Sequence, residues 1–137
     1  MIKIPRYVLD TDVFVLYLSA EEDGEIQRLL RDAESGKIRI LMNAYTLAEV
    51  YVQLCGRLND RQLEEVVRAA RALPIRWVPV SDDLVFAAAR LRANYELAAD
   101  AAIALATAMQ EHAILVTREP VAGAMEGVTV HSLPTRR

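Results

Sequence analysis

The chain of 137 residues has the length of one domain, and its hydrophobic content of 53% excludes a disordered tail. The net charge of −3 argues against a protein that coats duplex DNA through a basic surface, but it does not exclude a nuclease whose metal ion supplies positive charge. A single cysteine, Cys55, excludes an intrachain disulfide and a cysteine-based zinc site. No apolar run is long enough to cross a bilayer and no secretory signal is visible, so we expect a cytoplasmic protein without a membrane partner.

The first part of the chain alternates strand patterns with helix patterns. Residues 7–9 form a short apolar run that ends at Asp10, and helical spacing of apolar residues follows. An amphipathic helix is expected from Gly24 to Gly36, and a second strand at 38–42. Asn43 is the expected N-cap of the next helix. The apolar face of that helix should consist of Leu47, Val50, Tyr51 and Leu54.

The middle of the chain continues this alternation. We expect Asp60 to cap a helix that runs with helical period up to Leu73. A third strand is expected at 77–80, where its proline suits an edge strand or a strand end better than a central position. Ser81 should cap the helix that follows. Its apolar face should consist of Leu84, Val85, Ala88 and Leu91.

The last helix, from about residue 98 to residue 112, is apolar almost all round and should be buried on most sides. Strands are expected at 113–116 and 128–131. Strands that alternate with helices predict a parallel sheet covered on both faces. The expected fold class is therefore α/β, with three α/β/α layers, a central, mostly parallel sheet, and one domain over residues 1–137.

Two acidic residues follow expected strands. Asp10 stands at the end of the first strand, and Glu119 stands just past the end of the fourth. Ligands of open α/β sheets bind outside the carboxyl ends of the strands. If these two strands are neighbours, both carboxylates should face the same crevice.

Two further acids lie within helices. Asp100 occupies the first turn of the apolar helix, where it could act only as a dipole partner, but a carboxylate on a buried helix also needs a partner. Glu49 lies mid-helix among apolar residues, and from its position a surface salt bridge and a place in a site are both open.

Clustered carboxylates repel one another, and a divalent cation removes that cost. Oxygen ligands without histidine or cysteine favour Mg²⁺ or Mn²⁺ over zinc. His112 and His131 stand at the ends of expected elements, where surface or C-cap roles are favoured over catalysis.

Four short motifs in this order resemble those of PIN-domain nucleases, and the size is closest to the toxin subunits of VapBC-type toxin–antitoxin pairs. The motifs are Val8-Leu9-Asp10-Thr11-Asp12, Ala48-Glu49, Ala99-Asp100-Ala101 running into Ala106-Thr107-Ala108, and Leu115-Val116-Thr117-Arg118-Glu119.

The resemblance implies that Asp10, Glu49 and Asp100 hold Mg²⁺ or Mn²⁺ and that Glu119 completes the catalytic cluster. It also implies that Thr117 supports the site, together with Thr11 and Asp12 beside the first acid. Asp12 either belongs to this supporting set or caps the helix that begins there, and we favour the cap. The family usually has Asp at the position of Glu119, which leaves one-metal and two-metal chemistry open.

The implied function is metal-dependent cleavage of RNA phosphodiester bonds, in single-stranded or looped RNA. A cognate antitoxin and a homodimer are the implied partners. The helices between Gly24 and Leu73 would either form part of an antitoxin groove or pack as ordinary core.

Two alternatives remain. One is a PIN-fold RNA- or protein-binding module with a decayed site, which the glutamate at position 119 keeps open. The other is a haloacid-dehalogenase-like phosphatase, because Asp10-Thr11-Asp12 imitates its nucleophile motif, although the threonine and lysine which that family needs are misplaced.

Overall fold

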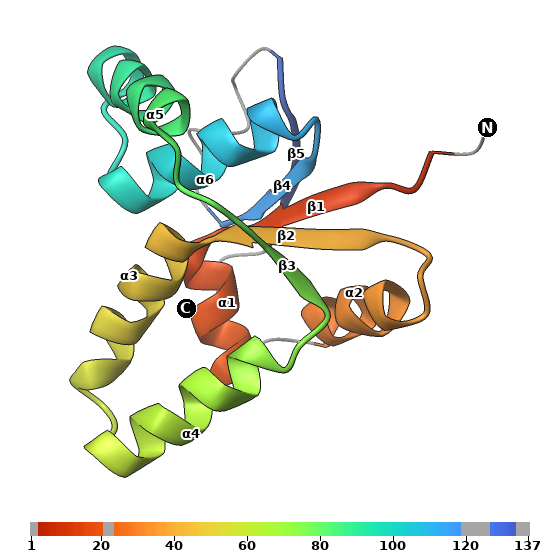
Figure 1. Ribbon diagram of the computed structural model, residues 1–137, viewed down its shortest axis with the longest axis vertical. Helices are drawn as coiled ribbons and strands as arrows, with labels where there is room; N and C mark the ends of the chain where they lie inside the picture. The colour runs from red at the N-terminus through yellow and green to blue at the C-terminus, as the bar shows by residue number, and fades with distance from the viewer. Residues whose placement is uncertain (1–2, 21–23, 119–126, 134–137) are drawn as a thin grey trace.

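The structure, a computed structural model, describes residues 3–20, 24–118 and 127–133. Its centre is a parallel sheet of five strands in the order β3-β2-β1-β4-β5 (Figure 1). The strands are β1 Arg6–Leu9, β2 Arg39–Asn43, β3 Ile75–Val78, β4 Ile114–Thr117 and β5 Thr129–Ser132. The helices of the described residues are α1 Thr11–Leu18, α2 Glu25–Glu34, α3 Ala44–Cys55, α4 Asp60–Arg71, α5 Asp82–Tyr95 and α6 Ala99–Gln110.

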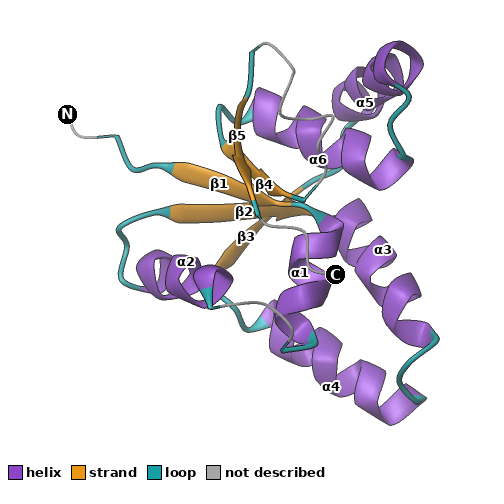
Figure 2. Ribbon diagram, turned by 180° about the vertical axis from the view of Figure 1, so that it is seen from behind, coloured by secondary structure: helices purple, strands orange, loops and turns teal. Residues whose placement is uncertain are grey.

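Helices cover both faces of this sheet, as Figure 2 shows from behind. Side chains of a strand alternate between faces, so neighbouring residues of β1 enter different cores. Val8 packs with α5 and α6, whereas Leu9 packs with α1, α2, α3 and α4. The predicted three-layer α/β/α architecture is confirmed.

All five predicted strands are present, and four of them differ from their predicted bounds by a single residue. The third differs more, because it begins at Ile75 and ends at Val78 instead of spanning 77–80. Pro79 has no backbone N–H to donate, so strand pairing ends before it. β3 is an edge strand, as the proline predicted.

Two of the predicted helix caps, Asn43 and Ser81, are confirmed, and two, Asp60 and Asp12, are wrong. Asn43 accepts a hydrogen bond from the backbone N–H of the residue three positions on, and Ser81 does the same for α5. The cap of α4 is Asn59 and not Asp60, because Asn59 forms a reciprocal capping box with Gln62.

The predicted apolar faces are correct in their centres and wrong at their flanks. Val50 and Leu54 of α3 are buried, but Tyr51 is 43% exposed. In α5, Leu84 and Ala88 are buried, while Val85 is 46% exposed. A residue one position away from a buried residue is rotated by about 100° around the helix and leaves the core face.

Helix α6 is the most buried helix of the described residues. Seven consecutive residues, 102–108, are buried, which confirms the prediction from its sequence. It lies in the layer that packs on one face of the sheet, beside α5 (Figure 1). No helix in the described ranges has both the length and the apolar character needed to cross a membrane.

Candidate functional site

The site begins at the point where the strand order reverses. β2 and β3, which follow β1 in the chain, lie on one side of it, and β4 and β5 lie on its other side. The carboxyl ends of β1 and β4 therefore flank the topological switch point, where open α/β sheets bind ligands. Asp10 follows β1 and Thr117 ends β4, and the two strands are neighbours, so the condition for their side chains to share one edge is met.

Asp10 is fixed at this point by hydrogen bonds to both carboxylate oxygens. Its Oδ1 accepts from the backbone N–H of Thr11 at 2.8 Å, which makes Asp10 the N-cap of α1. Its Oδ2 accepts from the Thr117 hydroxyl at 2.7 Å. The second bond joins the ends of β1 and β4 across the switch point. Thr117 is buried, and Asp10 is only 6% exposed.

Burial makes the negative charge of Asp10 costly. The pKa of Asp10 is raised from its ordinary value of 3.8 to about 6, and desolvation is the largest cause. The hydrogen bonds from Thr117 and Thr11 lower that pKa, and the charges of Asp100 and Asp12 raise it further. Desolvation outweighs the two hydrogen bonds, so this carboxylate is destabilised in the folded chain.

Asp100 lies at the second position of α6, and its partly buried side chain is close enough to raise the pKa of Asp10. The cap residue Ala98 makes no side-chain bond to the helix end. The first turn of α6 thus offers unpaired backbone N–H groups beside Asp100, and these favour a negative charge there.

Glu49 is partly buried on α3, one turn after Tyr45, whose phenol donates a hydrogen bond to it. The pKa of Tyr45 is raised by burial first, and then by the charges of Glu49 and Asp100. Tyr45 therefore lies within electrostatic range of both acids. Glu49 forms no salt bridge with any described residue, so the surface ion pair that its sequence context also allowed is absent there.

Asp12 does not cap α1, which corrects the favoured prediction. The cap is Asp10, and Asp12 lies exposed in the first turn. Its Oδ1 is 3.5 Å from the Gln53 side-chain nitrogen, a distance that makes a weak bond. Thr11 contributes its backbone N–H to the site, while its buried hydroxyl has no hydrogen-bond partner among the described residues.

Glu119 lies outside the described residues, and so its predicted place in the cluster stays a prediction. Of the two histidines, His131 lies one residue before the end of β5, in register with Val116 of β4, and His112 lies at the opposite edge of the sheet. His131 pairs with Glu25 of α2, and His112 lies in the turn after α6.

Asn43 and Tyr45 were not predicted to contribute to this region. Beyond capping α3, Asn43 donates a hydrogen bond from Nδ2 to the Thr107 hydroxyl of α6 at 2.9 Å. All of these groups are buried. The bond joins the helix that carries Glu49 to the helix that carries Asp100. The cap pattern of Asn43 was visible in the sequence, but the position of its second partner was not.

The donor set fits a hard divalent cation by its chemistry. Asp10, Asp100 and Glu49 offer only oxygen atoms, and the mutual repulsion seen at Asp10 is the kind that a cation offsets. In the described part of the chain, however, no three acidic, histidine or cysteine side chains converge closely enough to enclose a metal ion. The acids therefore share a region and a charge interaction, but not a closed coordination shell.

The sequence itself matches the family model of the PIN domain over residues 7–123. The chain therefore belongs to the PIN-domain family. Nucleases of this family generally use a divalent metal ion. No curated protein sequence matches the chain.

Solved structures place the fold among VapBC-type toxins. VapBC2 from Rickettsia felis, crystallised bound to a DNA fragment from its promoter, matches with a TM-score of 0.77 at 17% identity, over 94% of this chain and 99% of that chain. A toxin–antitoxin complex from Klebsiella pneumoniae matches with a TM-score of 0.65 at 24% identity, over 93% and 99%. VapC20 from Mycobacterium tuberculosis, described as a sarcin–ricin loop cleaving toxin, matches with a TM-score of 0.63 at 16% identity, over 80% and 86%. At these identities the matches establish the fold.

Proposed function

We propose that this protein is a metal-dependent endoribonuclease that hydrolyses RNA phosphodiester bonds and serves as the toxin of a toxin–antitoxin pair. The observation that supports the proposal most is the position of Asp10 together with the free-energy penalty on its buried negative charge. Its carboxylate is buried at the switch point, repelled by Asp100 and Asp12, and held in place by Thr117. Carboxylates with a perturbed pKa at such a position are typical of catalytic sites.

The cofactor proposed is Mg²⁺ or Mn²⁺, with Asp10, Glu49 and Asp100 as its protein ligands. A bound divalent ion supplies positive charge beside a phosphate and lowers the pKa of water. Each carboxylate has lone pairs for about four hydrogen-bond or ligand contacts. The two bonds from Thr11 and Thr117 use one site on each oxygen of Asp10, so lone pairs remain on both. Glu119 is proposed as the fourth catalytic acid, following the family motif.

Supporting residues have distinct tasks in this proposal. Thr117 and the Thr11 backbone N–H prevent rotation of the Asp10 carboxylate. Asn43 holds α3 and α6 at a fixed separation and so positions Glu49 and Asp100 relative to each other. Asp12 adds negative charge beside Asp10. RNA is the proposed substrate because the sarcin–ricin loop, the target named for the M. tuberculosis relative, is RNA.

The proposal is tested by cleavage of a mixed single-stranded RNA pool with Mg²⁺ or Mn²⁺, with EDTA as a control. Asp100→Asn should reduce cleavage by at least about 100-fold, a loss of about 3 kcal/mol in transition-state stabilisation. Asp60→Asn is the matched control, since Asp60 is also a first-turn acid but is exposed on α4. Equal cleavage by both variants would contradict the site.

Binding of Mn²⁺ provides a second readout that does not depend on finding the RNA substrate. Wild-type protein and Asp60→Asn should bind Mn²⁺ in a calorimeter, whereas Asp100→Asn and Asp10→Asn should bind it at least about tenfold more weakly. If antitoxin-free wild-type protein neither cuts RNA nor binds Mn²⁺, the nuclease proposal is wrong.

That outcome would favour the alternative, a PIN-fold binding module without catalysis. The observation on its side is the lack of a closed ligand group among the described residues. The phosphatase alternative has less support, because the chain matches the PIN domain over most of its length.

The proposed partners are an antitoxin protein and a second copy of this chain, in the cytoplasm, with residues 1–137 acting as one domain. Structures of similar fold were solved as toxin–antitoxin complexes. Helix α3 exposes Tyr51 and Val52, an apolar surface suited to a helix of a partner. Light scattering of the purified chain checks the dimer, and Val52→Glu should weaken capture by the co-expressed antitoxin.

A further inference from the structure

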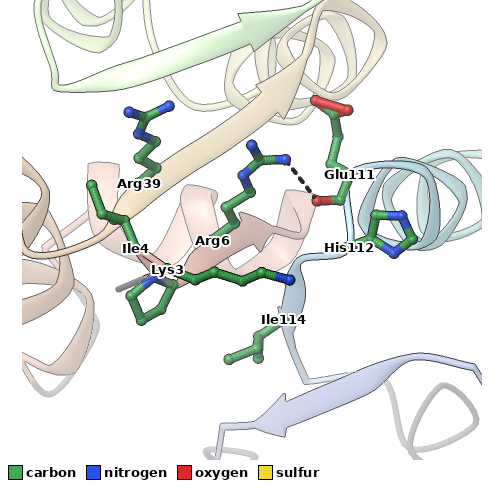
Figure 3. A pocket seen from close by; sticks show the side chains of 8 residues that line it. Lys3, Ile4, Arg6, Arg39, Glu111, His112 and Ile114 are labelled. Carbon is green, nitrogen blue, oxygen red and sulfur yellow. Dashed lines mark hydrogen bonds between the residues drawn. The ribbon is translucent and has the colours of Figure 1, made fainter. Parts of the chain in front are cut away.

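A cavity lies at the edge of the sheet where the strands begin, opposite to the edge that carries Asp10. This cavity of about 590 Å³ is lined by residues that precede or start β1, β2 and β4 and by the turn after α6 (Figure 3). Small-molecule sites have volumes of this order. β1 spans about 13 Å at the usual rise per residue, so this pocket is separate from the acids at the other end of the same strand.

Positive charge gathers in this pocket although the chain is acidic overall. Lys3, Arg6 and Arg39 line it, and Glu111 is the one acid among its described lining residues. The pocket thus holds a local charge of about +2 in a chain whose net charge is −3. Charges that outnumber their local partners favour a ligand of opposite sign.

The two arginines are direct neighbours across the sheet. Arg6 and Arg39 are register partners of β1 and β2, whose backbones lie about 4.8 Å apart. Each stands two residues before a side chain of the core under α5 and α6, so both stems leave the same face. Like charges placed directly opposite are unfavourable, and an anion between them would turn that repulsion into attraction.

The side chains of Lys3, Arg6 and Arg39 have N–H groups that donate no hydrogen bond to other described residues. Arg6 uses one guanidinium nitrogen to donate to the backbone carbonyl of Glu111 at 3.1 Å, which fixes its direction (Figure 3). Arg39 and Lys3 are exposed and form no ion pair within the described part of the chain. A guanidinium presents five N–H donors in a planar fork that matches phosphate oxygens.

Apolar groups complete the lining. Ile4 and Pro5 border the same cavity, and Ile114 closes it from the other face of the sheet, because Ile114 is the register partner of Tyr7 and not of Arg6. An inorganic anion would leave this surface without contact, whereas a ligand that joins an anionic group to a flat or apolar body would cover it. Arginine planes can also stack on nucleobases.

We propose that this pocket binds a nucleoside monophosphate, with the phosphate between Arg6, Arg39 and Lys3 and the nucleoside against Ile4 and Pro5. The inference is independent of the nuclease proposal, because it uses none of the acidic residues at the other edge.

Titration of ¹⁵N-labelled protein with adenosine, guanosine, cytidine and uridine 5′-monophosphates tests the site, with EDTA present so that no metal bridges a nucleotide to the acids. At least one nucleotide should shift the amide resonances of Arg6, Arg39 and Ile114. Adenosine and inorganic phosphate should each bind at least about tenfold more weakly than the best nucleotide. Lys3→Gln and Arg39→Gln should weaken that binding by about tenfold or more.

Arg76→Gln is the matched control, because Arg76 is an exposed arginine on β3 outside the pocket and its loss changes the net charge equally. Unchanged binding in this variant, with weaker binding in the other two, supports the site. Any of four results would overturn it: no nucleotide binds, all three variants weaken binding equally, phosphate or the nucleoside binds as well as the nucleotide, or the shifts map to Asp10 and Asp100.

Discussion

Replacement of Asp10 by asparagine should remove a pH dependence from the folding stability of the metal-free protein. Burial raises the pKa of Asp10 from 3.8 to about 6. The folded state therefore binds this proton more tightly than the unfolded state does. The resulting stability is fully present below pH 3.8 and is lost as the pH rises through 6. A shift of about 2 units at about 1.4 kcal/mol per unit amounts to about 3 kcal/mol.

Asparagine does not titrate, so only the wild type loses this stability as the pH rises. The unfolding free energy of the variant minus that of the wild type should therefore increase by about 3 kcal/mol between pH 3.8 and pH 7. Urea unfolding in EDTA, followed by the fluorescence of Trp77, measures both proteins. Trp77 is the only tryptophan and packs against the core beneath α1 to α4.

The control is Asp60→Asn, whose parent carboxylate is exposed at the start of α4. Its difference from wild type should change little over the same pH range. If the Asp10→Asn difference also changes by less than about 1 kcal/mol, burial does not penalise the Asp10 charge and the reasoning is refuted.

Three further substitutions test the contacts around the site and the core. Thr117→Val removes the hydroxyl that donates to Asp10, so the pKa of Asp10 should rise by a further 1 unit or more in a ¹³C-carboxyl NMR titration; an unchanged value would contradict the role of that bond. Asn43→Ala should lower the unfolding free energy by about 2–3 kcal/mol in urea unfolding, because a buried cap and its bond to α6 are both lost. The control Ser81→Ala should lose only an exposed cap, worth about 1 kcal/mol. Equal losses in the two variants would show that the bond to α6 adds nothing. Phe14→Ala should cost about 3–5 kcal/mol in the same assay, because Phe14 is fully buried, and a loss below 1 kcal/mol would place it outside the core.

Much of the fold was predictable because local chemistry determines it. Alternating strand and helix patterns predicted the parallel sheet, and Asn43 and Ser81 were recognisable as caps from sequence alone. The errors arose where neighbouring residues compete for one role. Asn59 and Asp60 are both good caps, and only the reach of Gln62 decides between them. Tyr51 belongs to an apolar pattern, but the face of α3 that packs is narrower than the pattern.

The candidate site was predictable only in part, because its partners are distant in sequence. The strand ends placed Asp10 and the region of Thr117 at one edge, but the bond between them spans 107 positions and depends on the strand order. Asn43 and Thr107 meet across 64 positions, through the packing of α3 on α6. No local pattern carries that information. The favoured role of Asp12 failed for a local reason, because Asp10, two residues earlier, accepts the bond at the end of the helix.

The charge of Asp10 itself is the feature that the fold does not need. An asparagine at this position would cap α1 through its side-chain oxygen, and its amide could donate to the Thr117 hydroxyl, so both contacts would survive without a buried charge. The negative charge strengthens these two bonds by less than its desolvation costs, and the net penalty is about 3 kcal/mol above pH 6. This carboxylate destabilises the fold and lies at the switch point of a parallel sheet, beside Asp100. Its charge is therefore best explained by a ligand that it binds. This argument, rather than the likeness to toxins, makes Asp10 the residue on which a test of the proposed chemistry should begin.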